Sequence, residues 1–274
     1  MKISNKTAKL IVGATLIVST ILFANKALHE GPVTSRTSVF EGKIYLAQPV
    51  PILMYHDISE ETKNRFRLPA KKLEEQFQYL QKNNFSAITL GSMIGGSMPR
   101  NSVVLTFDDI SIHFYKRVFP LLKKYNIKAT AFVIVGDVLD KGNGRLTWDM
   151  IREMEKSGLV DIQSHTFGHP NLKGCSLKKI EWELRKSKEL LENNLNKKID
   201  FIAWPYGKCN QNIKEIAKKV GYTGFVGCDG FLVRRRSIDL SNIGRFEIKG
   251  NRSKAYFEKF MNKFWYSKDL AGLD

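Results

Sequence analysis

Short apolar runs alternate with amphipathic stretches along most of the chain, and this alternation constrains the fold more than any other feature. The apolar runs, such as "VPILMYHDI", "SVVLTFDD" and "KATAFVIVG", are typical of strands. The clearest helical pattern covers residues 177–195, where apolar residues recur at spacings of three and four. Further helices are expected over residues 70–83, 114–125, 147–157, 211–220 and 253–266. Strands that alternate with helices predict an α/β fold with parallel strands and helices outside.

The start of the chain differs from the rest. Three lysines precede an uncharged run over residues 10–25, "LIVGATLIVSTILFAN". A basic start followed by a short apolar run is typical of a secretory signal. The run is shorter than a membrane span of about 20 residues, and no small-x-small cleavage site follows it. We therefore assign residues 1–27 to a cleaved signal peptide or a retained membrane anchor, and residues 28–48 to a linker. Either way we expect a secreted or surface-associated protein.

The composition is that of a folded and strongly basic protein. Hydrophobic residues make up 43% of the chain, and the formal net charge is +17. On an exported protein this charge favours anionic cell-wall polymers or a membrane surface as partners. The basic residues are dispersed except for the triplet over residues 234–236, so no nucleic acid is expected as a partner. The three cysteines are odd in number and widely spaced, which fits neither a disulfide framework nor a zinc ribbon.

Polar residues directly follow several of the apolar runs. His56 follows "PILMY", Asp108 and Asp109 follow "VVLTF", and His165 follows "VDIQS". The carboxyl ends of barrel strands carry the active sites of such folds. Strand side chains alternate between two faces, so adjacent aspartates serve one pocket only where the strand stops and the backbone turns. We therefore predict an active site at these strand ends.

Two of the five histidines, His165 and His169, lie in "SHTFGHP", where Gly168 and Pro170 favour a loop or a single turn. Two imidazoles and one carboxylate form a catalytic zinc set that leaves a coordination position for water. The metal lowers the pKa of that water from about 15.7 toward about 7. A second carboxylate can then take its proton. A carboxylate pair by itself is usually solvated, and a single histidine usually has a structural role. Because both motifs occur at successive strand ends, each makes a catalytic role of the other more convincing.

These motifs resemble those of the polysaccharide deacetylases with NodB homology, carbohydrate esterase family 4. "TFDD" at residues 106–109 resembles the first motif, "SHTFGHP" the second, and "WPYG" at residues 204–207 the third. The resemblance covers roughly residues 50–250. It implies a single domain over residues 49–274 with a distorted (β/α) barrel of the NodB-homology type.

The resemblance also implies roles for individual residues. Asp108 would act as the catalytic base, and three residues would hold one divalent metal ion per chain, for which we expect Zn²⁺. These metal ligands are Asp109, His165 and His169. The backbone N–H of Tyr206 would contribute to the oxyanion hole beside Pro205, and the rings of Trp204 and Tyr206 would stack on sugars.

The assignment of the general acid depends on which histidines the chain contains. In many relatives a late histidine is the acid, but no histidine follows His169 here. We therefore assign the acid to His56, with His113 as the alternative.

The chain departs from the family pattern at two positions near the catalytic base. Ile110 stands where the family usually has glycine after the aspartate pair, and a β-branched residue disfavours positive φ, so the turn must be built differently. The third motif lacks its leading arginine, because Ala203 stands in that region. We expect Arg245, in "IGRFEI", to supply the missing charge and orient Asp108.

Within the family, "PILMYHDI" and "FDDISIHFYKRVFPLLKKY" are similar to the poly-β-1,6-N-acetylglucosamine deacetylases of the intercellular adhesion protein B branch. The four-residue spacing of His165 and His169 matches the family in general, whereas the adhesin deacetylases place one more residue between the histidines. We expect a hydrolase that removes acetyl groups from N-acetylglucosamine residues of this surface polysaccharide, a biofilm adhesin. A peptidoglycan or chitin deacetylase and a non-catalytic glycan-binding relative remain alternatives.

Overall fold

The computed structural model describes residues 34–40, 43–46, 50–60, 65–95, 97–139, 144–227 and 237–266. The segment that we assigned to a signal or anchor, residues 1–27, lies outside these ranges. Within them, no helix is both long and apolar enough to cross a bilayer.

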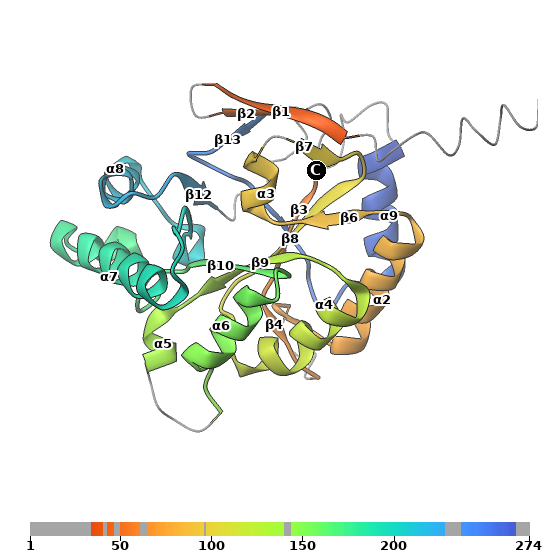
Figure 1. The fold of residues 1–274 in the computed structure, drawn as a ribbon, viewed down its shortest axis with the longest axis horizontal. Helices are drawn as coiled ribbons and strands as arrows, with labels where there is room; N and C mark the ends of the chain where they lie inside the picture. Colours follow the sequence, from red (N-terminus) through yellow and green to blue (C-terminus); the bar gives the residue numbers. More distant parts are fainter. Residues whose placement is uncertain are drawn as a thin grey trace, which may run out of the picture. The chain divides into compact units, whose positions relative to one another are not determined.

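A parallel sheet of eight strands forms the centre of the fold (Figure 1). Its strands are β3 (Ile52–Tyr55), β6 (Ser86–Ile88), β8 (Ser102–Phe107), β9 (Ala129–Val133), β10 (Val160–Ser164), β11 (Phe201–Ala203), β12 (Gly224–Val226) and β14 (Phe246–Glu247). The order is β12-β11-β10-β9-β8-β3-β14, and β6 pairs with the first half of β8. Ile243 pairs with Val226 of β12, while Phe246 pairs with Leu53 of β3. The short segment before β14 therefore links the two edges, and the sheet curls into a distorted barrel, as predicted.

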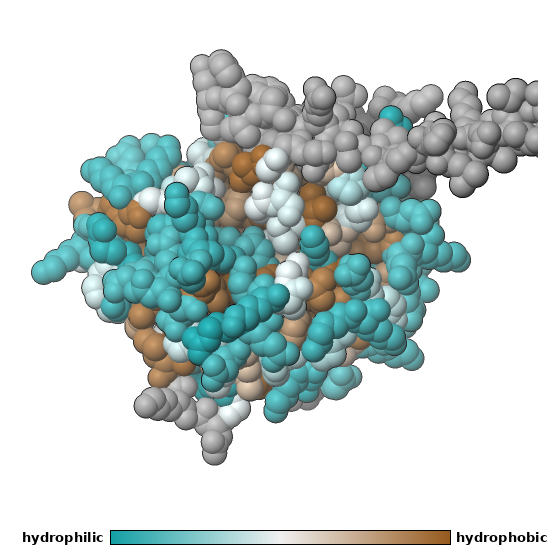
Figure 2. All heavy atoms as spheres, viewed as in Figure 1, coloured by the Kyte–Doolittle hydropathy of each residue, from teal (hydrophilic) through white to brown (hydrophobic). Residues whose placement is uncertain are grey.

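Helices cover the outside of this sheet (Figure 1). They are α2 (Ala70–Lys82), α4 (Phe119–Tyr125), α5 (Val135–Leu139), α6 (Trp148–Lys156), α7 (Leu177–Leu195), α8 (Gln211–Val220) and α9 (Lys254–Tyr266). The short helix α3 (Leu90–Ile94) instead packs Leu90 and Met93 against inward-facing residues of the strands. The helix expected from residue 114 begins as a π-helical turn, Phe114–Val118, and continues as α4. Side chains of Thr147, Ser176 and Asn210 cap α6, α7 and α8. Hydrophilic residues dominate the face shown in Figure 2, so these helices turn their polar sides outward.

A second sheet corrects our expectation of a linker over residues 28–48 for its described residues, 34–40 and 43–46. It has the order β13-β2-β1-β7 and consists of β1 (Thr34–Phe40), β2 (Lys43–Leu46), β7 (Ser97–Pro99) and β13 (Ser237–Asp239). β1 and β2 are antiparallel, with Val39 opposite Ile44. The segment has the β-branched and aromatic residues that favour strands, and pairing with β13 gives it a place in the fold.

Residues on each barrel strand alternate between two apolar layers. On β8, Leu105 and Phe107 pack in the outer layer beneath the helices, whereas Val104 packs in a second layer with residues of β3, β9, β11 and β12. These inner residues face one another across the barrel. The period of two continues past the strand ends, so it directs His56, Asp108 and His165 toward the interior side.

Candidate metal and catalytic site

The three residues that we expected to bind a metal lie together at the carboxyl end of the sheet. Nε2 of His165 and Nε2 of His169 each lie 3.4 Å from Oδ1 of Asp109. One donor atom from each of the three residues lies within 4.8 Å of the others. Two imidazole nitrogens and one carboxylate oxygen are donors that Zn²⁺ accepts, so these residues fit a divalent metal ion.

The backbone after β8 explains how two adjacent aspartates serve one pocket. Asp109 has a φ of 51°, in the left-handed region, while Ile110 does not adopt a positive φ and is buried at 7% exposure. The turn is therefore built on the aspartate instead of the residue after it. This reversal breaks the alternation of the strand, so Asp108 and Asp109 both face the site.

Hydrogen bonding and charge prepare the imidazole of His165 to act as a ligand. Its Nδ1 lies 2.9 Å from the carbonyl oxygen of Ala203, which can only accept, so Nδ1 carries the proton and Nε2 offers its lone pair. Burial lowers the pKa of His165, but the carboxylates of Asp109 and Asp108 outweigh burial and raise it overall. Burial and the charge of His165 lower the pKa of His169.

The "SHTFGHP" segment forms a loop, as expected, and two of its residues adopt positive φ. These are Thr166 at 68° and His169 at 55°. The N–H of His169 donates to Oγ1 of Thr166 at 2.9 Å, and the N–H of Gly168 donates to Oε2 of Glu183 at 2.7 Å. We did not predict Glu183. Its signal was a charged residue on the mainly apolar face of α7, next to Leu184.

Asp108 forms a bidentate ion pair with Arg245. Oδ1 and Oδ2 of Asp108 accept from Nη1 and Nη2 of Arg245, both at 2.6 Å. Nη1 of Arg245 also donates to Oγ1 of Thr106, and its Nε donates to the carbonyl of Gly227. Burial opposes ionisation of Asp108, yet the guanidinium outweighs it and holds the pKa of that carboxyl well below its usual range.

Arg245 itself is 1% exposed. It directly precedes β14 and reaches the base from there.

The two candidate acids differ in their surroundings. His56 follows β3, packs edge-on against Phe66 with ring centres 5.0 Å apart, and is close enough for its charge to lower the pKa of Asp108. Nδ1 of His113 lies 3.1 Å from Oδ1 of Asp57. The imidazole of His113 is thus engaged by a carboxylate, whereas that of His56 lies beside the expected base.

The third motif is split between the surface and the core. Tyr206 is 62% exposed, has a φ of 58°, and its ring centre lies 4.8 Å from that of His169. Pro205 is buried. Trp204 is 0% exposed and packs against Phe225, so our expectation that it stacks on sugars is wrong. The period of β11 directs this ring to the outer, helix-covered layer.

Comparison with known proteins finds similar sequences and similar folds. Residues 95–225 match the family model described as polysaccharide deacetylase. The poly-beta-1,6-N-acetyl-D-glucosamine N-deacetylase of Staphylococcus aureus (strain MRSA252) is 32% identical over 186 residues, which cover 62% of this chain and 63% of that protein. The chain thus spans less than two thirds of the length of the curated relatives it matches.

Solved structures agree with this assignment. The Streptococcus pyogenes deacetylase PplD, solved in complex with acetate, has a TM-score of 0.68 and 27% identity, and the match covers 77% of this chain and 97% of that chain. A polysaccharide deacetylase from Bacillus cereus also has a TM-score of 0.68, with 25% identity over 81% of this chain and 71% of that chain. Residues 95–225 therefore carry a polysaccharide deacetylase domain of the NodB-homology type, and the chain is similar in sequence and in fold to deacetylases.

Proposed function

We propose that this chain is an exported, metal-dependent N-deacetylase that removes acetyl groups from N-acetylglucosamine residues of a surface polysaccharide. One observation carries the proposal. The metal-donor set of Asp109, His165 and His169 lies next to a carboxylate, Asp108, that a buried arginine holds ionised. In a chain of this family, that pairing supplies both the ligands and the base that amide hydrolysis needs.

Asp109, His165 and His169 would hold the metal ion, which when bound supplies a Lewis acid for the acetamide carbonyl and an acidified water. Asp108 takes the proton of the attacking water. Its bidentate pair with Arg245 uses two lone pairs, and because an ionised carboxylate has about four acceptor sites, the others stay available. Arg245 also fixes the orientation of the carboxylate, so the base is positioned before substrate binds.

His56 would donate a proton to the departing amine, since it lies beside Asp108 and imidazole is a common general acid in enzymes. We assign the backbone N–H of Tyr206 to the oxyanion hole. The exposed ring of Tyr206, beside His169, is then the aromatic surface available to a sugar.

For the substrate we propose poly-β-1,6-N-acetylglucosamine. The similarity to a staphylococcal protein with that named substrate supports it, together with the resemblance at "PILMYHDI". The basic, apolar start of the chain supports export, and the net charge of +17 favours retention by anionic wall polymers or a membrane surface. Peptidoglycan is the main rival, because it presents the same acetamide on a β-1,4 backbone.

The test is acetate release from β-1,6 and β-1,4 N-acetylglucosamine oligomers of equal length, with and without a chelator. We expect faster release from the β-1,6 oligomer, loss of activity with chelator, and recovery on addition of Zn²⁺. A preference for the β-1,4 oligomer would overturn the substrate and leave the reaction standing. Undiminished release by metal-free protein would overturn the metal dependence.

A further inference from the structure

Helix α7 carries two polar side chains on the face that packs against the barrel. Glu183 is 2% exposed and Ser187 is 0% exposed, and one helical turn separates them. A buried carboxylate is costly unless it is hydrogen-bonded and paired with a cation. The partners of Glu183 therefore indicate what this helix face does.

Glu183 binds the middle of the loop between the two histidine ligands. Its Oε2 accepts the N–H of Gly168 at 2.7 Å, and its Oε1 lies 2.9 Å from Nζ of Lys179 one turn earlier. A Cβ atom at position 168 would lie 3.3 Å from Oε1, so glycine permits this close approach. The carboxylate thus ties α7 to the backbone directly before His169.

Ser187 supports the beginning of the same loop. Its Oγ lies 2.7 Å from Oγ of Ser164, which accepts the N–H of Thr166 at 3.2 Å and the hydroxyl of Tyr222 at 2.9 Å. Oγ1 of Thr166 in turn accepts the N–H of His169. Two stacked side chains of α7 therefore reach both halves of the loop.

The loop needs this support because its backbone is unfavourable. Thr166 and His169 both adopt positive φ, a region that residues other than glycine rarely occupy and that persists only where the surroundings hold it. The conformation of His169 also sets where its Nε2 lies relative to that of His165. Whatever fixes the loop therefore fixes the separation of two metal donors.

We propose that Glu183 is a positioning residue of the metal site, which holds the loop through Gly168 so that His165 and His169 are arranged for metal before it binds. The inference depends on the proposed metal site, but Glu183 itself is not a ligand. Its role is geometric and needs only an acceptor oxygen at this position. Outer partners of this kind commonly contribute about 10- to 100-fold to metal affinity.

The experiment measures Zn²⁺ affinity of the full chain by competition with a chromophoric chelator. We expect Glu183→Ala to weaken binding by about 10- to 100-fold. Glu183→Gln keeps an acceptor for Gly168 and should stay within a few fold of the original protein. Glu181→Ala is the matched control, because Glu181 lies on the exposed face of the same helix and pairs with Arg185. It should change nothing.

A visible spectrum of the Co²⁺-loaded protein reports ligand geometry directly, and we expect it to change in Glu183→Ala but not in Glu183→Gln. Equal Zn²⁺ affinity and unchanged spectra in a folded Glu183→Ala protein would overturn the inference. If that variant does not fold, Gly168→Ala takes its place, since the added methyl group crowds Oε1 and should weaken binding severalfold; unchanged affinity there would also overturn it. Failure of the original protein to bind Zn²⁺ would overturn the proposed metal site as well.

Discussion

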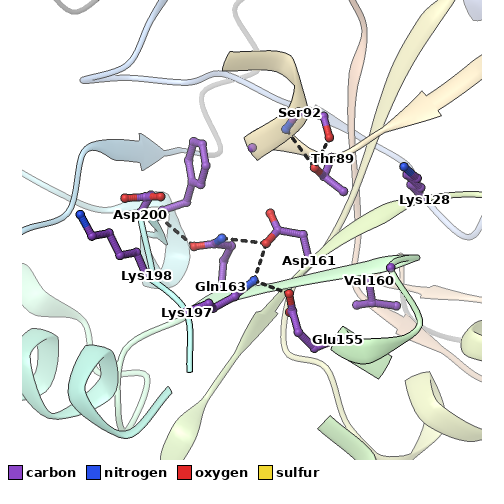
Figure 3. Close-up of a pocket in the computed structure, with 13 residues that line it drawn as sticks. Thr89, Ser92, Lys128, Glu155, Val160, Asp161, Gln163, Lys197, Lys198 and Asp200 are labelled. Carbon is purple, nitrogen blue, oxygen red and sulfur yellow. Dashed lines mark hydrogen bonds and ion pairs between the residues drawn. The ribbon is translucent and has the colours of Figure 1, made fainter. Parts of the chain in front are cut away.

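The carboxyl and amino ends of the parallel sheet both gather charged side chains, but they pair them differently. At the carboxyl end, the carboxylate of Asp109 faces the Nε2 atoms of two imidazoles, which are donors for a metal. At the amino end, a recess of about 340 Å³ holds Lys197 between two carboxylates. Nζ of Lys197 lies 2.8 Å from Oε1 of Glu155 and 2.6 Å from Oδ1 of Asp161 (Figure 3).

The amino-end group joins elements of the fold to one another. Gln163 donates to Oδ1 of Asp161 and accepts the N–H of Phe201, and Glu155 accepts the N–H of Ile162 (Figure 3 shows the bonds among the side chains). A fixed cation, Lys197, already pairs with both of its carboxylates. The carboxyl-end ligands instead converge on one point with no lysine or arginine on Asp109 among the described residues. Convergent donors, and not the presence of a recess, distinguish the proposed site.

The two ends also shift carboxyl pKa values in opposite directions. Burial raises the pKa of Glu155, and the single cation of Lys197 does not offset it fully. Burial acts the same way on Asp108, yet the bidentate Arg245 reverses the result. The number and geometry of the bonds to the cation therefore decide the sign.

The largest expected effect comes from removing a proposed metal ligand. His165→Ala should lose the bound metal and all measurable acetate release, because the remaining two donors do not complete the set. Elemental analysis and acetate release from a β-1,6 oligomer are the measurements. Lys197→Met, at the other end of the sheet, is the control and should retain both properties. Active protein without metal would show that the residues at the carboxyl end of the sheet do not act through a bound metal.

Removal of the base should come next in size. Asp108→Asn keeps the shape of the side chain but removes its basicity, so turnover should fall by about 100-fold or more. Because Asp108 is not among the proposed ligands, one metal per chain should remain. Loss of the metal together with activity would mean that Asp108 is itself a ligand.

The choice of acid predicts a smaller but still clear difference between two histidines. His56→Ala should lower turnover by about 100-fold, at the low end of the range for general acids, while His113→Ala should have little effect because Asp57 engages that imidazole. Turnover and its pH profile should be compared for the two variants. An unaffected His56→Ala protein beside an inactive His113→Ala protein would reverse the assignment.

Weakening the ion pair to the base should change the pH profile more than the maximal rate. A lysine in Arg245→Lys cannot bind both oxygens of Asp108, so the pKa of Asp108 should rise toward its ordinary value. The acidic limb of kcat/KM should then move to higher pH. In the original protein the lowered pKa of Asp108 stabilises the folded state at pH values above the unfolded-state pKa of about 3.9, and this stability is lost as pH falls through the folded-state pKa. The variant loses part of this stability, so it should also unfold more easily at pH 7. An unchanged acidic limb would show that another group titrates there.

The placement of several site residues could be predicted because side chains alternate between the two faces of a strand, and this alternation continues past the strand ends. The same rule applied to β11 would have placed Trp204 on the outer layer, where it is found. The pair between Arg245 and Asp108 could not be derived from local pattern, since 137 residues separate the two. Only the closure of the barrel by the segment before β14 brings Arg245 beside the base.

The loop between the histidines shows a different limit. Its glycine and proline predicted an irregular backbone, but positive φ at Thr166 and His169 depends on bonds from α7, a separate element. The sequence marks Glu183 only as a charge within an apolar stripe. Such a residue is an exception to helical periodicity, and only tertiary structure shows which backbone N–H it binds.

The smallest expected effect on turnover is at the amino end, where Lys197→Met should leave acetate release unchanged. The variant leaves Glu155 and Asp161 partly buried without their cation, so the free energy of unfolding should fall by about 1–3 kcal/mol at pH 7. Burial already raises the pKa of Glu155, and losing the cation raises the folded-state pKa of this carboxyl further above the unfolded value. The folded state then binds more protons, so the destabilisation should be present at pH 7 and shrink as pH falls and Glu155 protonates. Denaturant unfolding at pH 7 and pH 4.5 measures this difference.

Adding Glu155→Gln and Asp161→Asn to Lys197→Met should recover stability at pH 7. A loss of turnover in any of these folded variants would mean that the two ends of the sheet are coupled.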